Sequence, residues 1–340
     1  MSLTELIRLI IKLLLKPYVF IPLVFPGLIT VMIILLLTIW IERKIAAKVQ
    51  LRYGPLNVTR KLGGVLQLVA DLLRYLFAEP ITPEKTDKLA FLFSPLLLFG
   101  SAFIPVVLIP LSSEYYAVNS EISLLIVLAL ITIPPIFDLL IGWSSNNKYS
   151  LIGGLREGYL VISHEIPLLM STLSMAILYG SFNLIDIIEK QHGVKIGLIL
   201  NPLAAIVYIL SSYMATSRFP FEIAEAETEI VMGPYTEYSG ILYGLTMGAS
   251  YVKLYILSLV FAIIFLGGWK PIWLASFNPI ISGIILVGKS LIIVAIGIFL
   301  RAVYPRYRID QAIKIGWKIL TPLAVVSILL SLGLIAGGVV

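Results

Sequence analysis

Long apolar runs recur along the chain, and short polar segments separate them. Eight runs reach or exceed the length of about 20 residues that a membrane-crossing helix needs. The predicted spans cover residues 17–41, 89–113, 122–143, 158–185, 196–217, 238–269, 271–300 and 319–340. This pattern predicts an all-α integral membrane protein whose eight transmembrane helices form a single membrane domain over residues 1–340.

Two further segments have apolar residues at helical spacing but also contain charges. Residues 3–17, LTELIRLIIKLLLKP, predict an amphipathic N-terminal helix that lies on the membrane, not a cleavable signal peptide. In the first loop we expect a helix that is capped by Asn57 or Thr59 and runs to about Ala78. Its apolar positions are Leu62, Val65, Leu66, Val69, Leu72, Leu73 and Leu76. The periodicity favours an interfacial helix anchored in lipid, and the alternative is a docking platform for a soluble subunit.

Basic residues are concentrated on one side of the predicted bundle. The loops after the first, third, fifth and seventh spans hold 17 of the 25 Lys and Arg residues. Because loops rich in Lys and Arg stay in the cytoplasm, both termini are predicted to lie outside the cell membrane. The net charge of +6 then faces lipid head groups or a cytoplasmic partner, and needs no nucleic acid to explain it.

The composition agrees with a membrane protein and narrows its chemistry. Hydrophobic residues make up 59% of the chain and charged residues 13%, with a mean hydropathy of +1.01; soluble domains are about 45–50% apolar and about 25% charged. The absence of cysteine excludes disulfides, thiolate zinc sites and cysteine-ligated iron–sulfur clusters within this chain. His164 and His192 are too few for a typical haem or copper site, so we expect neither a metal site nor a redox centre here.

Acidic residues gather in one short stretch, RFPFEIAEAETEIVMGPYTEYSG, at residues 218–240 in the predicted loop between spans five and six. It holds Glu222, Glu225, Glu227, Glu229 and Glu237. A helix beginning near Pro220 would put Glu222, Glu225 and Glu229 within about 60° of one another, with Glu227 nearly opposite. The apolar neighbours predict a partly buried cluster with raised pKa values and a capacity to bind protons. The alternative is a solvated acidic helix.

Several ionisable residues fall inside the predicted spans or at their edges. They are Asp138, Glu157, His164, Glu165, Lys253 and Lys289. Ionisable groups are costly in the bilayer, so each is a candidate functional residue. Alternating acids and bases favour a proton path, and the alternative for each lysine is a buried ion pair that locks the bundle.

Short motifs in the cytoplasmic loops carry a family likeness. They are Glu42-Arg43-Lys44, Gln50, Arg52 and Gly54-Pro55; Leu66, Gln67, Ala70 and Asp71; Gly142-Trp143, Ser145, Asn146, Lys148 and Tyr149; Gly153, Gly154 and Arg156; Ser163, Glu165 and Pro167; Arg218, Pro220, Phe221, Glu225, Glu227, Glu229, Glu237 and Tyr238; and Pro305 to Lys318. In this order the chain resembles the H-type membrane subunits of respiratory complex I, NADH:quinone oxidoreductase, whose mitochondrial counterpart is called subunit 1. The resemblance covers nearly the whole chain.

The resemblance implies a non-redox subunit that joins a cytoplasmic iron–sulfur arm to ion-pumping, antiporter-like membrane subunits. The isolated chain is then not expected to be catalytic, and the iron–sulfur clusters belong to partner subunits. By the resemblance, a quinone cavity or subunit interface involves Arg43, Gln50, Arg52, Asp71, Arg218, Arg306, Arg308 and Asp310. A proton path involves Asp138, Glu157, His164, Glu165, Glu222, Glu225, Glu227, Glu229 and Lys253.

Some positions depart from the family pattern and keep alternatives open. His164 stands where the family commonly has Tyr, and Glu222 stands where it commonly has Asp. The segments IAEAETEI and EYSG are similar to ferredoxin-driven relatives, the membrane-bound hydrogenase and sulfur-reductase complexes, which have hydrogenase-like subunits and use no quinone. A stand-alone secondary transporter is a third reading, but it predicts inverted repeats, and the loops here differ in length and motif. The sequence leaves open the electron donor, the terminal acceptor and the pumped ion.

Overall fold

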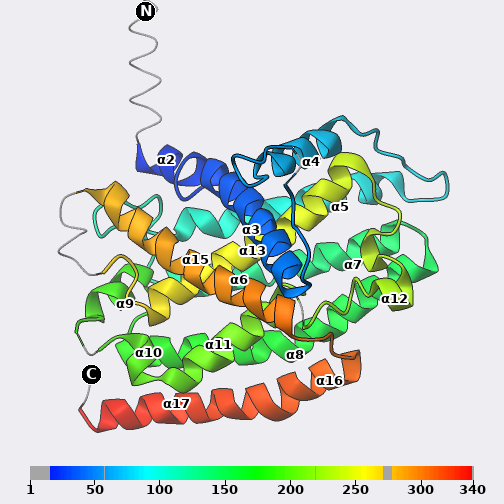
Figure 1. The fold of residues 1–340 in the computed structure, drawn as a ribbon. Helices are drawn as coiled ribbons and strands as arrows, with labels where there is room; N and C mark the ends of the chain where they lie inside the picture. The colour runs from blue at the N-terminus through cyan, green and yellow to red at the C-terminus, as the bar shows by residue number, and fades with distance from the viewer. Residues whose placement is uncertain (1–15, 57, 194, 219, 271–277, 339–340) are drawn as a thin grey trace, which may run out of the picture.

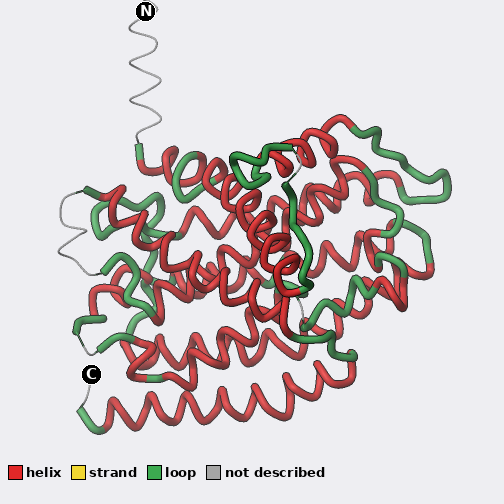
Figure 2. The backbone as a smooth tube through the Cα atoms, viewed as in Figure 1, coloured by secondary structure: helices red, strands yellow, loops and turns green. Residues whose placement is uncertain are grey.

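The computed structural model describes residues 16–56, 58–193, 195–218, 220–270 and 278–338. The expected N-terminal amphipathic helix falls outside these residues. Every regular element in the described ranges is helical, as the hydropathy pattern predicts, and Figure 2 draws the described part of the tube as helices and loops. The class of fold, an all-α membrane protein, is therefore confirmed.

Seven helical segments among the described residues are long and apolar enough to cross a membrane. They are Pro17–Val49, Lys88–Leu108, Ser123–Ser144, Lys148–Tyr179, Gly240–Phe265, Pro279–Val303 and Ile309–Ala336. The predicted span at 196–217 instead forms α10 (Gly197–Leu200) and α11 (Pro202–Ala215), divided at Asn201. With 14 residues, α11 falls short of the length of about 20 that a full span needs.

Three of the seven segments are interrupted, two of them at prolines and one at a π-helical turn. The cis Phe25–Pro26 peptide separates α2 (Pro17–Leu23) from α3 (Leu28–Val49). Pro134 begins α7 (Pro134–Ser144) after α6 (Ser123–Ile131), because a proline lacks the amide proton that would continue the preceding helix. Near the C-terminus, α16 (Ile309–Ile315) continues through a π-helical turn at Gly316–Leu320 into α17 (Thr321–Ala336).

The central helix of the bundle is α13 (Gly240–Phe265), and every residue from Val252 to Phe265 is buried. It contacts α5 (Lys88–Phe103), α15 (Pro279–Val303), α11, α3 and α4 (Leu66–Phe77). The longest helix is α8 (Lys148–Tyr179), which contacts α7, α11 and α17. Figure 1 shows α3 and α15 on one side of α13, and α8, α11 and α17 on the other.

Shorter helices occupy the connections. They are the turn η1 (Ile104–Leu108), α9 (Leu184–Lys190), α12 (Glu227–Ile230) and the turn η2 (Gly233–Tyr235). The helix of the first loop, α4, begins at Leu66 and not near Thr59, so the predicted start is wrong. Gly63 and Gly64 have φ values of +62° and +80°, and two left-handed residues in succession cannot belong to an α-helix.

The turn η2 rests directly on α8, because Gly153 has no side chain to keep it away. A Cβ atom at Gly153 would lie 2.6 Å from Pro234. This close approach places Tyr235, the next residue, against α7 and α8. The acid-rich loop is thereby attached to the bundle instead of projecting from it.

We expect Gly153→Val to lower the melting temperature of the purified protein by several degrees, because overpacking costs about 1–3 kcal/mol. Gly100→Val in α5 is the matched control, since a Cβ there meets nothing within 4 Å. Thermal unfolding followed by fluorescence checks both variants. Equal melting temperatures for the two variants would show that the contact between Gly153 and Pro234 is unimportant.

Candidate functional site

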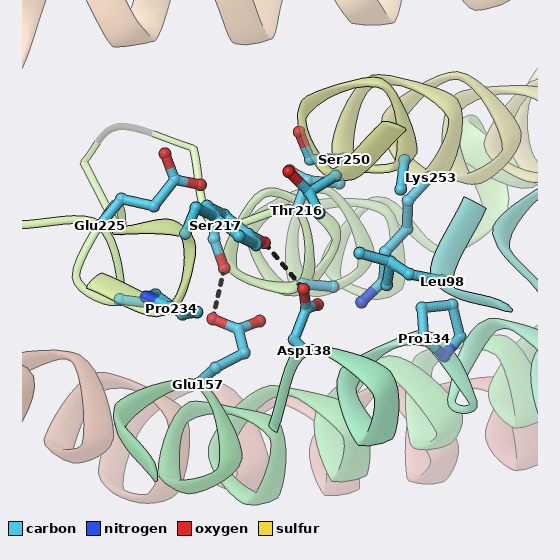
Figure 3. A pocket seen from close by; sticks show the side chains of 15 residues that line it. Leu98, Pro134, Asp138, Glu157, Thr216, Ser217, Glu225, Pro234, Ser250 and Lys253 are labelled. Atoms are coloured by element: carbon cyan, nitrogen blue, oxygen red, sulfur yellow. Dashed lines mark hydrogen bonds between the residues drawn. The ribbon is translucent and has the colours of Figure 1, made fainter. Parts of the chain in front are cut away.

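A small polar cavity of about 30 Å³ lies among α7, α8, α13 and the loop that follows α11. Its charged wall consists of Asp138, Glu157, Glu225 and Lys253. Figure 3 shows these side chains approaching the cavity from three helices and the loop. A cavity needs roughly 10–15 Å³ to hold one water, so this space suits a few water molecules among ionisable groups.

Two hydroxyl groups hold the carboxylates of this cavity in place. Tyr235 donates a hydrogen bond from its hydroxyl to Asp138 Oδ1 at 2.7 Å, and Ser217 Oγ donates to Glu157 Oε2 at 2.7 Å (Figure 3). Burial, followed by the carboxylates of Asp138 and Glu225, raises the pKa of Tyr235 well above its usual value. The hydroxyl therefore keeps its proton and remains a donor to Asp138.

Glu225 is the acid of this group that lies in the loop. Burial and then the charge of Glu222 raise the pKa of Glu225, the charge of Arg218 lowers it, and Asp138 and Glu157 raise it, so that the pKa is about 8. At neutral pH the carboxyl group is mostly protonated, and a modest change in its surroundings moves it through its titration. The predicted partly buried acid with a raised pKa is present at this position.

The predicted helix through the acid-rich stretch is wrong. Residues 222–226 are not helical, and α12 supplies one turn only, from Glu227 to Ile230. Ile223, Ala224 and Ala226 are all buried, so burial of these apolar side chains draws the chain into the bundle as a loop and removes the predicted common face. The polar lining of the cavity accepts such non-helical backbone.

The outer acids of the stretch are solvated and paired. Glu229 forms an ion pair with Arg156, at 2.5 Å between Oε2 and Nη1, and the Glu229 side chain is 53% exposed. Glu227 is also exposed, and Glu237 accepts a hydrogen bond from Asn147 Nδ2 at 2.6 Å. The alternative of a solvated acidic surface therefore describes Glu227 and Glu229, whereas Glu225 is half-buried and lines the small cavity.

Most ionisable residues of the spans lie near the small cavity, and Lys289 lies apart from them. Lys253 lies in the electric field of Glu157, Asp138 and Glu165. His164 is 1% exposed, and neither ring nitrogen has a hydrogen-bond partner among the described residues. His164 is also within the field of Lys253, so these residues form one electrostatic group with the small cavity.

Lys289 does not pair with an acid among the described residues, contrary to the expected alternative. Its ammonium donates to the carbonyl oxygens of Leu266 at 2.6 Å, Gly268 at 2.8 Å and Lys270 at 2.6 Å. A cation placed there binds the free carbonyl groups that follow the end of α13. We assign Lys289 a structural part in the fold.

A second, much larger cavity of about 790 Å³ lies between α3, α4, α5, α13 and α15. Its walls are mostly apolar, and its charged and polar side chains are Glu42, Arg43, Gln50, Arg52, Asp71, Tyr75, Tyr251, Arg301 and Tyr304. Arg43 bonds to Asp71 at 2.6 Å, and Arg52 Nε donates to Gln50 Oε1 at 2.7 Å. Four residues predicted for a cavity or interface, Arg43, Gln50, Arg52 and Asp71, are thus brought together here.

The remaining predicted cavity or interface residues lie elsewhere. Arg218 and Arg306 form ion pairs with Glu42 and Glu222, between the two cavities. Arg308 and Asp310 form a pair at 3.6 Å with side chains 79% and 54% exposed, and neither lines either cavity. These two residues are therefore part of the surface.

Glu42, Tyr251 and Arg301 were missed as individual site residues. Glu42 is 9% exposed and continues the buried stripe Val31, Ile34 and Thr38 on α3 at spacings of three and four residues. An acid in an otherwise apolar stripe is a signal that a search by helical period detects. Tyr251 and Arg301 had no comparable signal, because only their contacts with Glu42 distinguish them.

The fold and the site define a multi-pass membrane protein that keeps ionisable groups inside its helical bundle, next to a large apolar cavity. The chain belongs to the NADH dehydrogenase family, whose model matches residues 23–332. It is 37% identical over 290 residues to the NADH-quinone oxidoreductase H subunit of Bacillus cytotoxicus, covering 85% of this chain and 86% of that protein. The H subunit from a Geobacillus species is 37% identical over 287 residues, covering 84% and 85%. That of Geobacillus thermodenitrificans is 36% identical over 290 residues, covering 85% and 86%.

The raised pKa of Glu225 predicts a pH dependence of stability. The folded protein binds more protons than the unfolded chain between the ordinary value of 4.5 and about 8, so stability falls as pH rises through this window. We expect Glu225→Gln to remove this part of the decline. Glu229→Gln, which changes an exposed acid, is expected to keep the wild-type slope.

Melting temperatures measured between pH 5 and pH 9 check this expectation. The same slope for wild-type protein and Glu225→Gln would show that Glu225 is charged in the folded protein throughout the range.

Proposed function

We propose that this chain is the non-redox membrane subunit of a complex I-like, ion-translocating oxidoreductase. It connects a cytoplasmic iron–sulfur arm to pumping subunits and carries no redox cofactor of its own. The observation that carries the proposal is that α13 lines both cavities, with Tyr251 at the large one and Ser250 and Lys253 at the small one. A ligand chamber and a row of buried acids therefore share one helix.

We propose a quinone as the ligand of the large cavity. The volume of about 790 Å³ lies within the range of about 300–1,000 Å³ for sites that enclose organic ligands of this size. The apolar walls suit a ring and an isoprenoid tail, and Arg43, Arg52 and Tyr251 can donate hydrogen bonds to carbonyl oxygens. The names of the similar subunits also support quinone chemistry in the complex.

We propose that the small cavity belongs to a proton path. Glu225 titrates close to neutral pH, and the cavity holds Asp138, Glu157 and Lys253 next to it. His164 and Glu165 extend the path along α8, while Glu222, Glu227 and Glu229 supply protons from the cytoplasmic surface. Moving one charge across about 100 mV is worth about 2.3 kcal/mol, which is the scale of energy that such a path has to transmit.

The topology follows from the same assignment. Together α10 and α11 form a short eighth span, and α4 lies at the cytoplasmic interface, where its exposed apolar residues Leu66, Val69, Leu73 and Phe77 contact lipid. Both termini are outside the cell membrane, as the distribution of Lys and Arg predicts. Iron–sulfur and hydrogenase-like subunits dock on the basic cytoplasmic loops, and antiporter-like subunits lie beside the bundle.

The rival assignment is the same subunit in a ferredoxin-driven hydrogenase or sulfur reductase that uses no quinone. The acid-rich stretch favours it, and the large cavity favours the quinone enzyme. A purified complex that forms hydrogen or sulfide and does not reduce quinone would establish the rival. A chain that transports ions when isolated would establish a secondary transporter instead.

A first variant tests the ligand of the large cavity. Gly248 lines it on α13, and Gly248→Leu fills part of its volume. Because one methylene in an apolar pocket changes binding by at least roughly tenfold, we expect the KM for quinone to rise by roughly that factor. Steady-state quinone reduction by the purified complex measures it, with electron input to a soluble acceptor unchanged.

Gly288→Leu on α15 is the matched control, since a Cβ there meets nothing within 4 Å and the residue does not line the cavity. Identical KM values for the two variants would rule out quinone in this cavity.

A second set of variants tests the proton path. We expect Asp138→Asn and Glu165→Gln to lose most proton translocation in proteoliposomes, because neither amide can take up or release a proton. Electron input to a soluble acceptor should persist in both. Glu114→Gln, which changes an exposed acid in another loop, is expected to pump normally, and normal pumping by the first two variants would make those acids structural.

A further inference from the structure

Five charged side chains are linked by ion pairs that begin in the wall of the large cavity, and we call them the bridging cluster. They are Glu42 on α3, Arg218 and Glu222 in the loop after α11, Arg301 on α15 and Arg306 in the loop after α15. Their side chains are between 11% and 27% exposed. Three guanidinium groups face two carboxylates, so the cluster carries one net positive charge in a region of low solvent access.

The carboxylate of Glu42 is shared among three groups. Arg301 contacts its Oε1, Tyr251 donates a hydrogen bond from its hydroxyl to Oε2 at 2.9 Å, and Arg218 Nη1 lies 3.6 Å from the same Oε2. Glu42, Tyr251 and Arg301 all line the large cavity, and Arg218 lines neither cavity. One acid thus joins the wall of the large cavity to an arginine behind it.

Arg218 continues the connection towards the small cavity. Its guanidinium carbon stacks 3.6 Å from the centre of the Tyr251 ring, and Nη2 donates to Ser250 Oγ at 3.0 Å. Ser250 is part of the lining of the small cavity. The positive charge of Arg218 acts on Glu225, whose pKa it lowers against the larger effect of burial.

A second route runs through Glu222. Arg301 Nη2 lies 3.6 Å from Glu222 Oε1, and Arg306 Nη2 lies 3.6 Å from Glu222 Oε2. Arg301 therefore touches Glu42 and Glu222 at once. Glu222 in turn acts on Glu225 with the sign opposite to that of Arg218, so a shift of Arg301 reaches Glu225 along both routes.

We propose that Glu42 is a positioning residue that transmits a change of charge in the large cavity to Glu225. The inference rests on the proposed function. A negative charge on the ligand attracts Arg301, so Glu42 turns to Arg218 and offsets more of its positive charge. Glu225 then takes up a proton more readily. Loss of the charge on Glu42 has the opposite effect, because Arg218 acts on Glu225 without compensation.

The groups that contact Glu42 come from three parts of the fold. Glu42 faces Arg301 from α15, Arg218 from the loop and Tyr251 from α13. Its neighbour on α3, Arg43, is held by Asp71 of α4. Glu42 therefore reaches Glu225 through Arg218, and through Arg301 and Glu222 along the second route.

The test measures the protonation of Glu225 in the full complex. Infrared difference spectra recorded across pH contain a carboxyl band that Glu225→Gln removes, and this loss assigns the band. We expect Glu42→Gln to move the midpoint of the band down by about one pH unit or more. Asp71→Asn also removes a carboxylate from the large cavity but does not touch Arg218, so it should leave the midpoint in place.

Tyr251→Phe keeps the ring beneath Arg218 and removes the hydrogen bond to Glu42. Oε2 is then free to move towards Arg218, so the midpoint is expected to move up, opposite to Glu42→Gln. Tyr251→Phe also tests the inference if the complex does not assemble with Glu42→Gln. A midpoint that is unmoved or lowered in Tyr251→Phe would overturn the inference, and so would equal shifts in Glu42→Gln and Asp71→Asn.

The outcomes separate this inference from the proposed function. If the wild-type complex does not reduce quinone, and Glu42→Gln and Tyr251→Phe shift the midpoint as expected, the quinone assignment fails. The link from Glu42 to Glu225 is then still supported. If the complex reduces quinone and Glu42→Gln leaves the midpoint in place, the link is overturned and the quinone assignment stands.

Discussion

Removing carboxylates from water is the constraint on which this structure depends. A buried charge is stable only when protons, cations or hydrogen-bond donors compensate it. The protein uses each of these means: Tyr235 and Ser217 donate to Asp138 and Glu157, and Lys253 lies among the acids. Glu225 keeps a proton up to about pH 8. Acids compensated in different ways within one small space can exchange protons when a neighbouring charge changes.

The same constraint explains why the chain is not helical at the small cavity. A helix satisfies its own backbone and presents side chains outward, whereas residues 216–218 and 220–226 form non-helical backbone inside the bundle. Such backbone is tolerated at membrane depth where it is buried in protein or lines a polar cavity. The loop brings Glu225 next to Asp138 and Glu157, and the missing side chain of Gly153 allows η2 to attach the loop to α8.

Much of this arrangement could be predicted from sequence, and the failures have physical causes. Hydropathy located the helices that cross the membrane, since the bilayer imposes length and apolarity on each of them. It did not register the break at Asn201, which divides the segment at 196–217 into α10 and α11. The helical wheel failed for Glu222, Glu225 and Glu229, because buried apolar neighbours decided the local conformation. Arg43, Gln50, Arg52 and Asp71 were found through the resemblance, whereas Tyr251 and Arg301 depend on tertiary contacts that no local pattern contains.

The position of α13 connects the large cavity to the small one. Tyr251 lines the large cavity and Lys253 lines the small one. The same helix holds Arg218 through the Tyr251 ring and the Ser250 hydroxyl. Screening is weaker inside a protein than in bulk water, so a charge in the large cavity acts more strongly on Glu42 and Arg301, which line it, than it would in solution. Because the cluster has three cations for two anions, it cannot satisfy every pairing at once. A change of charge at the large cavity is therefore expected to redistribute these pairings, and Glu225 is the acid in the loop at the small cavity that receives the effect.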